Sequence, residues 1–232
     1  MPLYPSLYQI NTRILLQERG QALGRPATLD DIPDGDLDRW ASLGFDWLWP
    51  LGVWQTGTAA RDVSRGNPEW RQEYLRQLPD LREEDVSGSP FAVQSYSPHT
   101  DFGGRDALLR FRDRLKRRGL KMLLDFVPNH TAPDHPWVAN RPEFYVHGSE
   151  DDLTREPYNY RRVRTGKGDT ILALGRDPYF AGWPDTLQLN YRHAGFRAAM
   201  TETLLQIAQL CDGVRCDMAM LVLPDEIGRA HV

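Results

Sequence analysis

The chain has 232 residues, of which 41% are hydrophobic and 26% charged, and its formal net charge is −4. These values are typical of a globular protein with one large domain or two small ones. The acidic balance argues against a nucleic-acid partner or a membrane surface, because both attract clustered basic residues. The first residues lack the basic and apolar regions of a secretion signal, and no run approaches the ~18 apolar residues of a membrane span.

The cysteines and the C-terminus add two expectations. Cys211 and Cys216 fall at a predicted helix end and in a predicted strand, which is poor geometry for a disulfide, so a cytoplasmic location is expected. Residues 226–232 (E-I-G-R-A-H-V) match the translation of a common sequencing adapter. We expect them to be an artefact and the chain to be an N-terminal fragment of a longer protein.

Strands and helices alternate along the chain. Four strands are predicted, over residues 7–16, 45–51, 120–127 and 213–217. Helices are predicted over residues 36–44, 68–78, 105–118 and 196–207. This alternation predicts parallel βαβ units. Residues 128–193 are polar, contain Pro and Gly, and are too long for a simple loop, so they predict a small inserted subdomain.

Two of the predicted strands end in charged residues. The third runs through L-L-D-F-V-P-N-H, which contains Asp125, and the fourth lies in D-G-V-R-C-D-M-A-M, which contains Arg215 and Asp217. Since residues two apart share a face of a strand, Arg215 and Asp217 are expected to point the same way. In a (β/α)8 barrel, the carboxyl ends of the strands carry the chemistry. The pattern therefore predicts that Asp125, Arg215 and Asp217 meet at the mouth of a site.

This predicted cluster has two interpretations. Two buried carboxylates would repel each other and take up protons, unless a guanidinium between them keeps both charged. An ionised, desolvated carboxylate is what a covalent glycosidase mechanism needs as its nucleophile. A structural ion pair inside a barrel explains the same residues, since such networks occur without a catalytic role.

Other candidate ligand-binding residues follow the second and third strands. His130 is placed to donate a hydrogen bond to a ligand hydroxyl, and Asn129 offers an amide oxygen for Ca²⁺. Phe91 and Tyr96 are candidates for a sugar-stacking platform. Anchoring of the loop by buried rings explains these two aromatic residues equally well. Zinc-spaced cysteines, a glycine-rich phosphate loop and a G-x-S-x-G motif are all absent from the sequence.

Four segments in the same order resemble glycoside hydrolase family 13, the alpha-amylase family. D-F-V-P-N-H resembles its first signature and G-V-R-C-D-M-A-M its second, which usually reads G-x-R-x-D. S-P-F-A-V-Q-S-Y-S-P-H-T-D-F-G-G resembles the segment before the second barrel helix, and T-L-Q-L-N-Y the short signature near the end of domain B. The resemblance implies retaining cleavage or transfer of α-glucosidic bonds.

The resemblance also implies roles for the residues that match the motifs. Asp217 would be the nucleophile, Arg215 would hold it charged, and Asp125 would support Arg215. His130 would bind the sugar, and Asn129 would match the family's calcium-binding asparagine. No cofactor is required beyond this candidate structural Ca²⁺.

The chain departs from the family pattern in three places. Phe91 stands where many members carry a stacking Tyr, and residues 218–220 stand where many amylases place small or basic residues and a His. The family's general-acid Glu and stabilising Asp follow later strands, and no residue here can be assigned to either. We therefore expect this polypeptide to be inactive alone.

The expected fold class is α/β, as the N-terminal half, about four β/α units, of a TIM (β/α)8 barrel with a small domain B inserted after the third strand. Expected boundaries are 1–127 for the first part of the barrel, 128–193 for the insertion and 194–225 for the continuation. The expected parent is a retaining α-glycosidase or transglycosylase acting on an α-glucan, oligosaccharide or disaccharide. The alternatives are a non-catalytic barrel used as a scaffold or sugar-binding protein, and an unrelated barrel enzyme.

Overall fold

The computed structural model describes residues 3–223, so the predicted artefact at 226–232 lies outside the described residues. The chain divides into two compact units, each assembled from separate stretches of sequence. The first unit comprises Met1–Gln55, Tyr96–Phe126 and Thr201–Cys216. The second unit comprises Thr56–Ser95, Val127–Met200 and Asp217–Val232.

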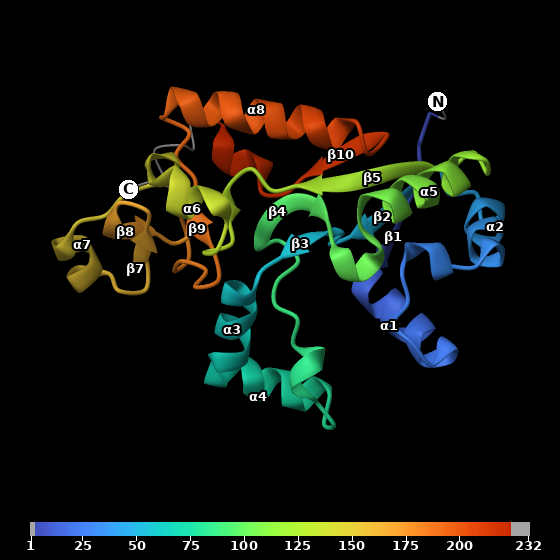
Figure 1. Ribbon diagram of the computed structural model, residues 1–232, viewed down its shortest axis with the longest axis horizontal. Helices are drawn as coiled ribbons and strands as arrows, with labels where there is room; N and C mark the ends of the chain where they lie inside the picture. The colour runs from blue at the N-terminus through green and yellow to red at the C-terminus, as the bar shows by residue number, and fades with distance from the viewer. Residues whose placement is uncertain (1–2, 224–232) are drawn as a thin grey trace. The chain divides into compact units, whose positions relative to one another are not determined.

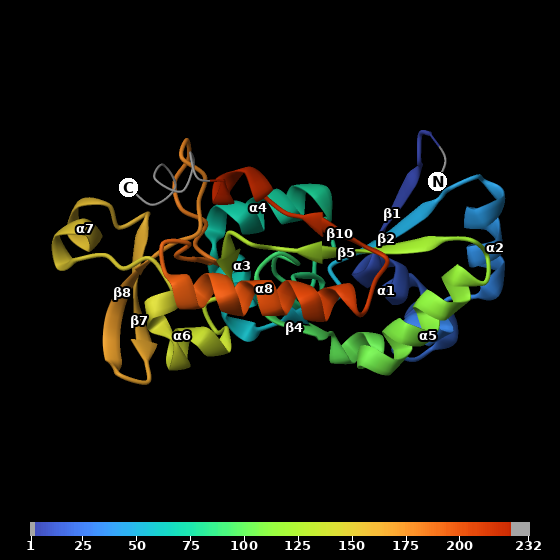
Figure 2. The same ribbon diagram turned by 90° about the horizontal axis from the view of Figure 1, so that it is seen from above.

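The first unit is built on a four-stranded parallel sheet. Its strands, in spatial order, are β1 (Leu7–Asn11), β2 (Trp47–Leu51), β5 (Lys121–Phe126) and β10 (Gly213–Cys216). Figures 1 and 2 show these strands side by side, and each neighbouring pair is parallel. The sheet confirms the predicted βαβ units. Leu48, Met122 and Leu124 are fully buried, which places the centre of this core on β2 and β5.

Helices follow the strands of this unit, as the sequence predicts. They are α1 (Thr12–Leu23), α2 (Asp34–Ser42) and α5 (Gly104–Lys116), with 3₁₀ turns at Leu29–Asp31 and Thr100–Phe102. Helix α5 packs against β5 and α2. Its apolar face buries Leu108, Phe111 and Leu115 completely, which confirms the amphipathic helix predicted from their spacing.

The prediction for the first strand is wrong in its second half. Strand β1 ends at Asn11, and α1 begins at Thr12 where the sequence predicts continued strand. The side chain of Asn11 accepts a hydrogen bond from the backbone N–H of Ile14 at 3.2 Å. This N-cap satisfies an otherwise unpaired donor and starts the helix despite the β-branched and apolar residues that follow.

The second unit begins with a helical segment. Helix α3 (Thr58–Gly66) is followed by α4 (Pro68–Gln77) and a 3₁₀ turn at Glu83–Asp85. Asn67 caps α4 by accepting from the backbone N–H groups of Glu69 and Trp70 at 3.0 and 3.1 Å, as the Asn-Pro pair predicts. Strands β3 (Trp54–Thr56) and β4 (Val93–Pro98), whose residues are divided between the two units, form a two-stranded sheet. The sequence did not predict α3, β3 or β4.

Residues 128–193 carry their own secondary structure, as expected for an inserted subdomain. The helical elements are α6 (Pro136–Asn140), a 3₁₀ turn at Pro142–Phe144 and α7 (Glu150–Arg155). The strands are β6 (His130–Thr131), β7 (Tyr160–Thr165), β8 (Gly168–Ala173) and β9 (Leu187–Gln188). β7 and β8 form an antiparallel hairpin with α7 beside it (Figure 1), and β6 pairs antiparallel with β9. This second pairing places His130 opposite Gln188.

Helix α8 (Ala194–Ala208) leads from the insertion to β10, and a 3₁₀ turn at Ala219–Val222 follows that strand. Rings from the insertion pack against the start of α8: Phe196 meets Trp137, Phe144 and Tyr191 with centroids 4.9–5.9 Å apart. In the described part of the chain, every helix is too short or too polar to cross a membrane. Cys211 is buried, Cys216 is exposed, and both are free thiols.

Candidate active site

Asp125 and Arg215 form an ion pair in the first unit. They lie directly opposite each other in the parallel register of β5 and β10, so their side chains project from the same face. Arg215 Nη1 lies 3.5 Å from Asp125 Oδ1. The Asp125 side chain is only 2% exposed, whereas that of Arg215 is 33% exposed. The structure thus brings together two of the three charged residues that the sequence places at one site.

The buried Asp125 carboxylate has further donors from the end of β2. Asp125 Oδ2 accepts from the indole Nε1 of Trp49 at 3.1 Å and from the backbone N–H of Gly52 at 3.3 Å. The Arg215 guanidinium lies 4.9 Å from the centre of the Trp49 ring, within cation–π range. These groups favour the ionised carboxylate and fix the guanidinium. The sequence analysis did not single out Trp49 as a site residue, although residues two apart in a strand share a face and Trp49 therefore lies on the same face of β2 as Trp47.

Tyr96 belongs to an aromatic cluster of the first unit. Its ring centroid lies 5.5 Å from that of Trp54 in an edge-on arrangement and 6.1 Å from that of Phe126. Trp54 is itself anchored, since its Nε1 donates to the backbone carbonyl of Asp125 at 2.7 Å. These contacts favour the loop-anchoring interpretation of Tyr96, and its role in sugar stacking stays a prediction.

Asp217 lines a cavity of the second unit, which we call the Asp217 cavity. Its volume is about 350 Å³. The residues around it are Ser89, Phe91, His130, Trp183, Asp185, Thr186, Asp217 and Met218. Three residues singled out from the sequence (Asp217, His130 and Phe91) therefore meet at one cavity, although they come from three distant parts of the chain.

His130 is a neutral hydrogen-bonding group on the wall of this cavity. The residue is 4% exposed, and burial lowers the pKa of its imidazole to about 4. The ring packs edge-on against Trp183, with centroids 5.1 Å apart. Gly175 allows this packing, because a Cβ there would lie 2.8 Å from His130 Cβ and would also meet the hydroxyl of Thr186. At neutral pH, His130 therefore carries one ring proton and no charge.

A chain of amides decides which nitrogen of His130 carries that proton. The backbone N–H of Arg176 donates to Gln188 Oε1 at 3.2 Å, which fixes the orientation of this amide. Gln188 Nε2 then donates to Asn129 Oδ1 at 2.9 Å, so Asn129 Nδ2 faces His130 Nδ1 at 3.3 Å. Since an amide nitrogen only donates, His130 Nδ1 accepts and Nε2 keeps the proton. Nε2 of His130 is thus a hydrogen-bond donor.

The same contacts involve Asn129, the candidate calcium ligand. Its side-chain oxygen already accepts a hydrogen bond from Gln188, and the residue is fully buried. Among the described residues, no group of three or more His, Cys, Asp or Glu side chains could hold a metal ion. Ca²⁺ takes six to eight oxygen ligands, which include backbone and amide carbonyls, so the role of Asn129 as a calcium ligand stays a prediction.

The sequence did not indicate Asp185, a second carboxyl group on the Asp217 cavity. Asp185 is 6% exposed, and burial raises the pKa of its carboxyl group. The backbone N–H of the same residue and the charge of Arg161 partly offset that effect. Its place just before T-L-Q-L-N-Y, in the sequence W-P-D-T, is the only signal that could have pointed to it.

Met218, which follows Asp217, has a backbone conformation that is rare for its residue type. Its φ of 50° and ψ of 35° lie in the left-handed region, and it precedes the 3₁₀ turn at Ala219–Val222. Such a conformation costs a non-glycine residue roughly 1–2 kcal/mol and is concentrated at functional sites. The strain lies in the residue directly after Asp217.

The Asp217 cavity combines groups that suit a polyhydroxylated ring. The carboxyl groups and the Ser89 and Thr186 hydroxyls can accept hydrogen bonds from ligand hydroxyls, and His130 Nε2 can donate one. The rings of Phe91 and Trp183 offer flat apolar faces. A volume of about 350 Å³ lies at the small end of the usual range for ligand sites.

Comparisons with known proteins agree with this chemistry. The family model "Alpha amylase, catalytic domain" matches residues 92–229, more than half of the chain. The alpha-amylase MalA of Haloarcula japonica is 35% identical over 216 residues, which are 93% of this chain and 25% of that protein. An alpha-glucosidase of Culex pipiens is 32% identical over 146 residues, which are 59% of this chain and 24% of that protein. The chain thus spans about a quarter of the length of these curated relatives.

Solved structures show the fold. An alpha-amylase from Lactobacillus plantarum superimposes with a TM-score of 0.64 at 25% identity, over 96% of this chain and 40% of that structure. The trehalulose synthase from Pseudomonas mesoacidophila gives a TM-score of 0.61 at 16% identity, over 94% and 36%. The chain therefore belongs to the alpha-amylase family, glycoside hydrolase family 13, and forms an N-terminal part of its (β/α)8 barrel, with the inserted domain B after the third barrel strand.

Proposed function

We propose that this chain is part of a retaining enzyme that cleaves or transfers α-glucosidic bonds, with Asp217 as the nucleophile. The observation that carries the proposal is that Asp217, His130 and Phe91 line one cavity. The relatives named above, an alpha-amylase and an alpha-glucosidase, support an α-glucan, oligosaccharide or disaccharide as the substrate.

The proposed reaction has two steps. In the first, the Asp217 carboxylate attacks the anomeric carbon, the bond to the leaving oxygen breaks, and a general acid protonates that oxygen. In the second, water or a sugar hydroxyl attacks the same carbon and loses its proton to the conjugate base of that acid. The ester bond to Asp217 breaks, and the two inversions restore the α configuration.

Other residues bind and orient the sugar. His130 donates from Nε2 to a hydroxyl of the sugar in the cleavage position, and Phe91 packs against its ring. Arg215 keeps the nucleophile charged, and Asp125 holds Arg215 through their ion pair. Tyr96 contributes to the stacking platform through the loop it anchors. Asn129 acts through its hydrogen bond to His130 and stays the candidate residue for a structural Ca²⁺.

The general acid is a separate part of the proposal. A retaining enzyme needs a second carboxyl group ~5–5.5 Å from the nucleophile. The family's acid is a Glu after a later strand, so we propose that residues 1–225 do not turn over substrate alone. We also propose the domain boundaries 127/128 and 193/194, and a cytoplasmic location, which two free thiols support.

The test uses the full-length protein encoded by the gene. Proton NMR of the products from maltose, maltotriose and starch should show the α anomer first, as retention requires. Asp217→Asn should lower kcat by roughly 10³-fold or more. Asp151→Asn, an exposed Asp distant in sequence from the cavity residues, is the matched control and should leave kcat unchanged.

Three outcomes would contradict the proposal. Turnover that survives Asp217→Asn, or a β anomer as first product, would remove Asp217 as the nucleophile. Glucan binding by the full-length protein with no turnover under any condition would favour the non-catalytic sugar-binding alternative.

A further inference from the structure

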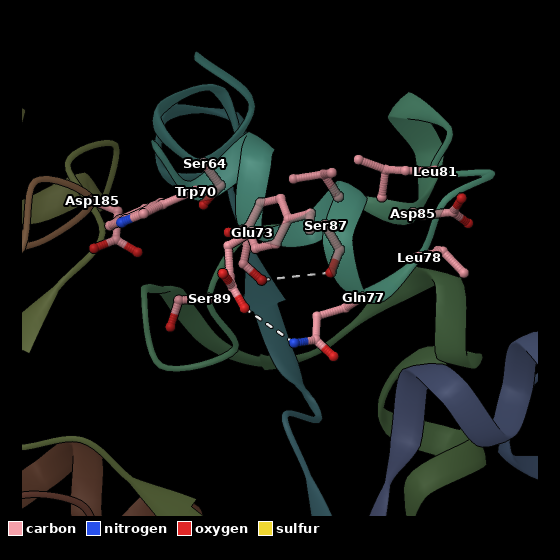
Figure 3. Close-up of a pocket in the computed structure, with 13 residues that line it drawn as sticks. Ser64, Trp70, Glu73, Gln77, Leu78, Leu81, Asp85, Ser87, Ser89 and Asp185 are labelled. Atoms are coloured by element: carbon pink, nitrogen blue, oxygen red, sulfur yellow. Dashed lines mark hydrogen bonds between the residues drawn. The ribbon is translucent and has the colours of Figure 1, made fainter. Parts of the chain in front are cut away.

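A second and larger cavity lies beside helix α4, and we call it the α4 cavity. Its volume is about 560 Å³, well within the range of ligand sites. Figure 3 shows the side chains around it. They come from α3 and α4, from residues 78–89, which we call the return segment, and from Asp185: Ser64, Trp70, Glu73, Tyr74, Gln77, Leu78, Leu81, Asp85, Val86, Ser87, Gly88, Ser89 and Asp185.

One face of α4 is turned to this cavity. Trp70, Glu73, Tyr74 and Gln77 follow the i, i+3, i+4, i+7 spacing of a single helix face. An aromatic face of this kind normally packs into a core, yet α4 has no buried residue, and Trp70 and Tyr74 are only half-buried. The two rings therefore remain available for contact with a ligand.

Arginines hold the wall opposite α4 in place. Arg65 Nε donates to the backbone carbonyl of Val86 at 3.1 Å, and its Nη2 donates to the backbone carbonyl of Glu83. Arg71 forms an ion pair with Glu83 at 2.6 Å. These contacts fix the return segment to both helices, so the cavity exists before a ligand arrives and binding costs little ordering.

The lining chemistry favours a neutral sugar chain. Glu73, Asp85 and Asp185 supply carboxylates, and the serines and Gln77 supply further acceptors, whereas no Lys, Arg or His of the described residues lines the cavity. An anionic ligand would meet only like charge here. Hydroxyl donors of a sugar suit the carboxylates, and its C–H face suits the rings of Trp70 and Tyr74.

Asp185 and Ser89 line both the α4 cavity and the Asp217 cavity. In Figure 3 the Trp70 indole is directed toward Asp185. We propose that the α4 cavity binds an additional stretch of α-glucan and that one oligosaccharide occupies both cavities, with Asp185 binding a hydroxyl at their junction. The enzyme therefore prefers oligosaccharides to disaccharides. This inference rests on the proposed function for the occupant of the Asp217 cavity.

The experiment measures affinity in the full-length Asp217→Asn protein, so that no substrate is consumed. Titration calorimetry with maltose, maltotriose and maltoheptaose should show affinity rising with chain length. Trp70→Ala should weaken maltoheptaose about tenfold and leave maltose unchanged, and Trp70→Phe should restore most of the loss. Leu75→Ala, on the exposed face of the same helix, is the matched control and should match the parent.

Steady-state kinetics of the otherwise wild-type enzyme gives a second readout. Trp70→Ala should raise KM for maltoheptaose by about the same factor and leave kcat/KM for maltose unchanged. An effect of Trp70→Ala that is equal for maltose and maltoheptaose, or absent for both, would overturn the inference. If the protein with Asp217 intact shows no turnover, but Trp70→Ala still weakens binding of maltoheptaose and not of maltose, the proposed function is overturned and this inference stands.

Discussion

At the scale of single residues, two buried histidines of the second unit couple stability to pH. Burial lowers the pKa of both His130 and His135 to about 4, whereas an unfolded histidine titrates near 6.5. Between these values the unfolded chain binds more protons than the folded one. The free energy of unfolding is therefore unaffected by these two histidines above about pH 6.5. It decreases as the pH falls toward 4, by about 3 kcal/mol for each residue.

Replacing either histidine should remove its share of this loss. Urea unfolding between pH 7 and 4 should show a smaller decrease in stability for His130→Gln and for His135→Gln, and the smallest decrease for the double variant. A single variant that keeps the full wild-type dependence would show that its imidazole is protonated in the folded protein.

Met218 allows a test of strain beside the proposed nucleophile. A β-branched side chain tolerates the left-handed region poorly, so Met218→Val should lower the free energy of unfolding by about 1–2 kcal/mol and also lower kcat, because Asp217 is displaced. Met218→Asn, which accepts this conformation more readily, is the matched control and should keep both values. If Met218→Val keeps the wild-type kcat, the backbone conformation of residue 218 does not determine the position of Asp217.

At the scale of secondary-structure elements, an arginine ladder attaches α5 to the segment before β2. Arg110, Arg114 and Arg118 pair in turn with Asp30, Asp34 and Asp38. The arginines are spaced four residues apart, and so are the aspartates, so successive arginines pair with successive aspartates. Arg114 also donates to two backbone carbonyls outside its own helix, those of Leu29 and Ile32, whereas Arg118 donates to the carbonyl of Arg114 within the helix. Its side chain is 15% exposed, against 58% for Arg110.

The ladder should therefore be unequal in its contribution to stability. Arg114→Ala should destabilise the protein by about 1–2 kcal/mol, because two carbonyls lose a charged donor in a partly buried place. Arg110→Ala should have little effect, since exposed ion pairs contribute little. Thermal or urea unfolding compares the two, and equal effects would show that the charges alone decide the contribution of the ladder.

Local signals predicted the elements that depend on their own sequence. The apolar spacing of α5 and the Asn67-Pro68 start of α4 were sufficient for these two helices. Helix α1 was missed because its first residues have strand-like composition, while the deciding contact is the cap from Asn11 to Ile14. Strands β3 and β4 were missed because short strands gain their identity from pairing partners that a single sequence does not show.

At the scale of the whole molecule, the sequence predicted the residues of the candidate site better than their surroundings. Strand alternation was enough to expect Asp125 beside Arg215, and the motifs were enough to single out Asp217, His130 and Phe91. The Asn129–Gln188 amide pair and the role of Asp185 could not be predicted, because they join positions about 60 to 100 residues apart and depend on how the chain folds back.

The sheet of the first unit suggests how the 232-residue chain should behave by itself. In the described residues, β1 and β10 are its edge strands, each with one side free of a strand partner, whereas a complete barrel has no edge. Unpaired backbone groups on an edge recruit further strands. We therefore expect the isolated chain to self-associate, with an apparent mass that rises with concentration in light scattering.

A charge on an edge should oppose this association. Leu7 opens β1 and is 46% exposed, so Leu7→Lys should lower the apparent mass by making strand addition at that edge unfavourable. Leu43→Lys, at an exposed position of 62% outside the strands, is the matched control and should leave association unchanged. Only Leu7→Lys alters an edge strand. If both variants reduce self-association equally, exposed apolar area drives the association and the sheet edge does not.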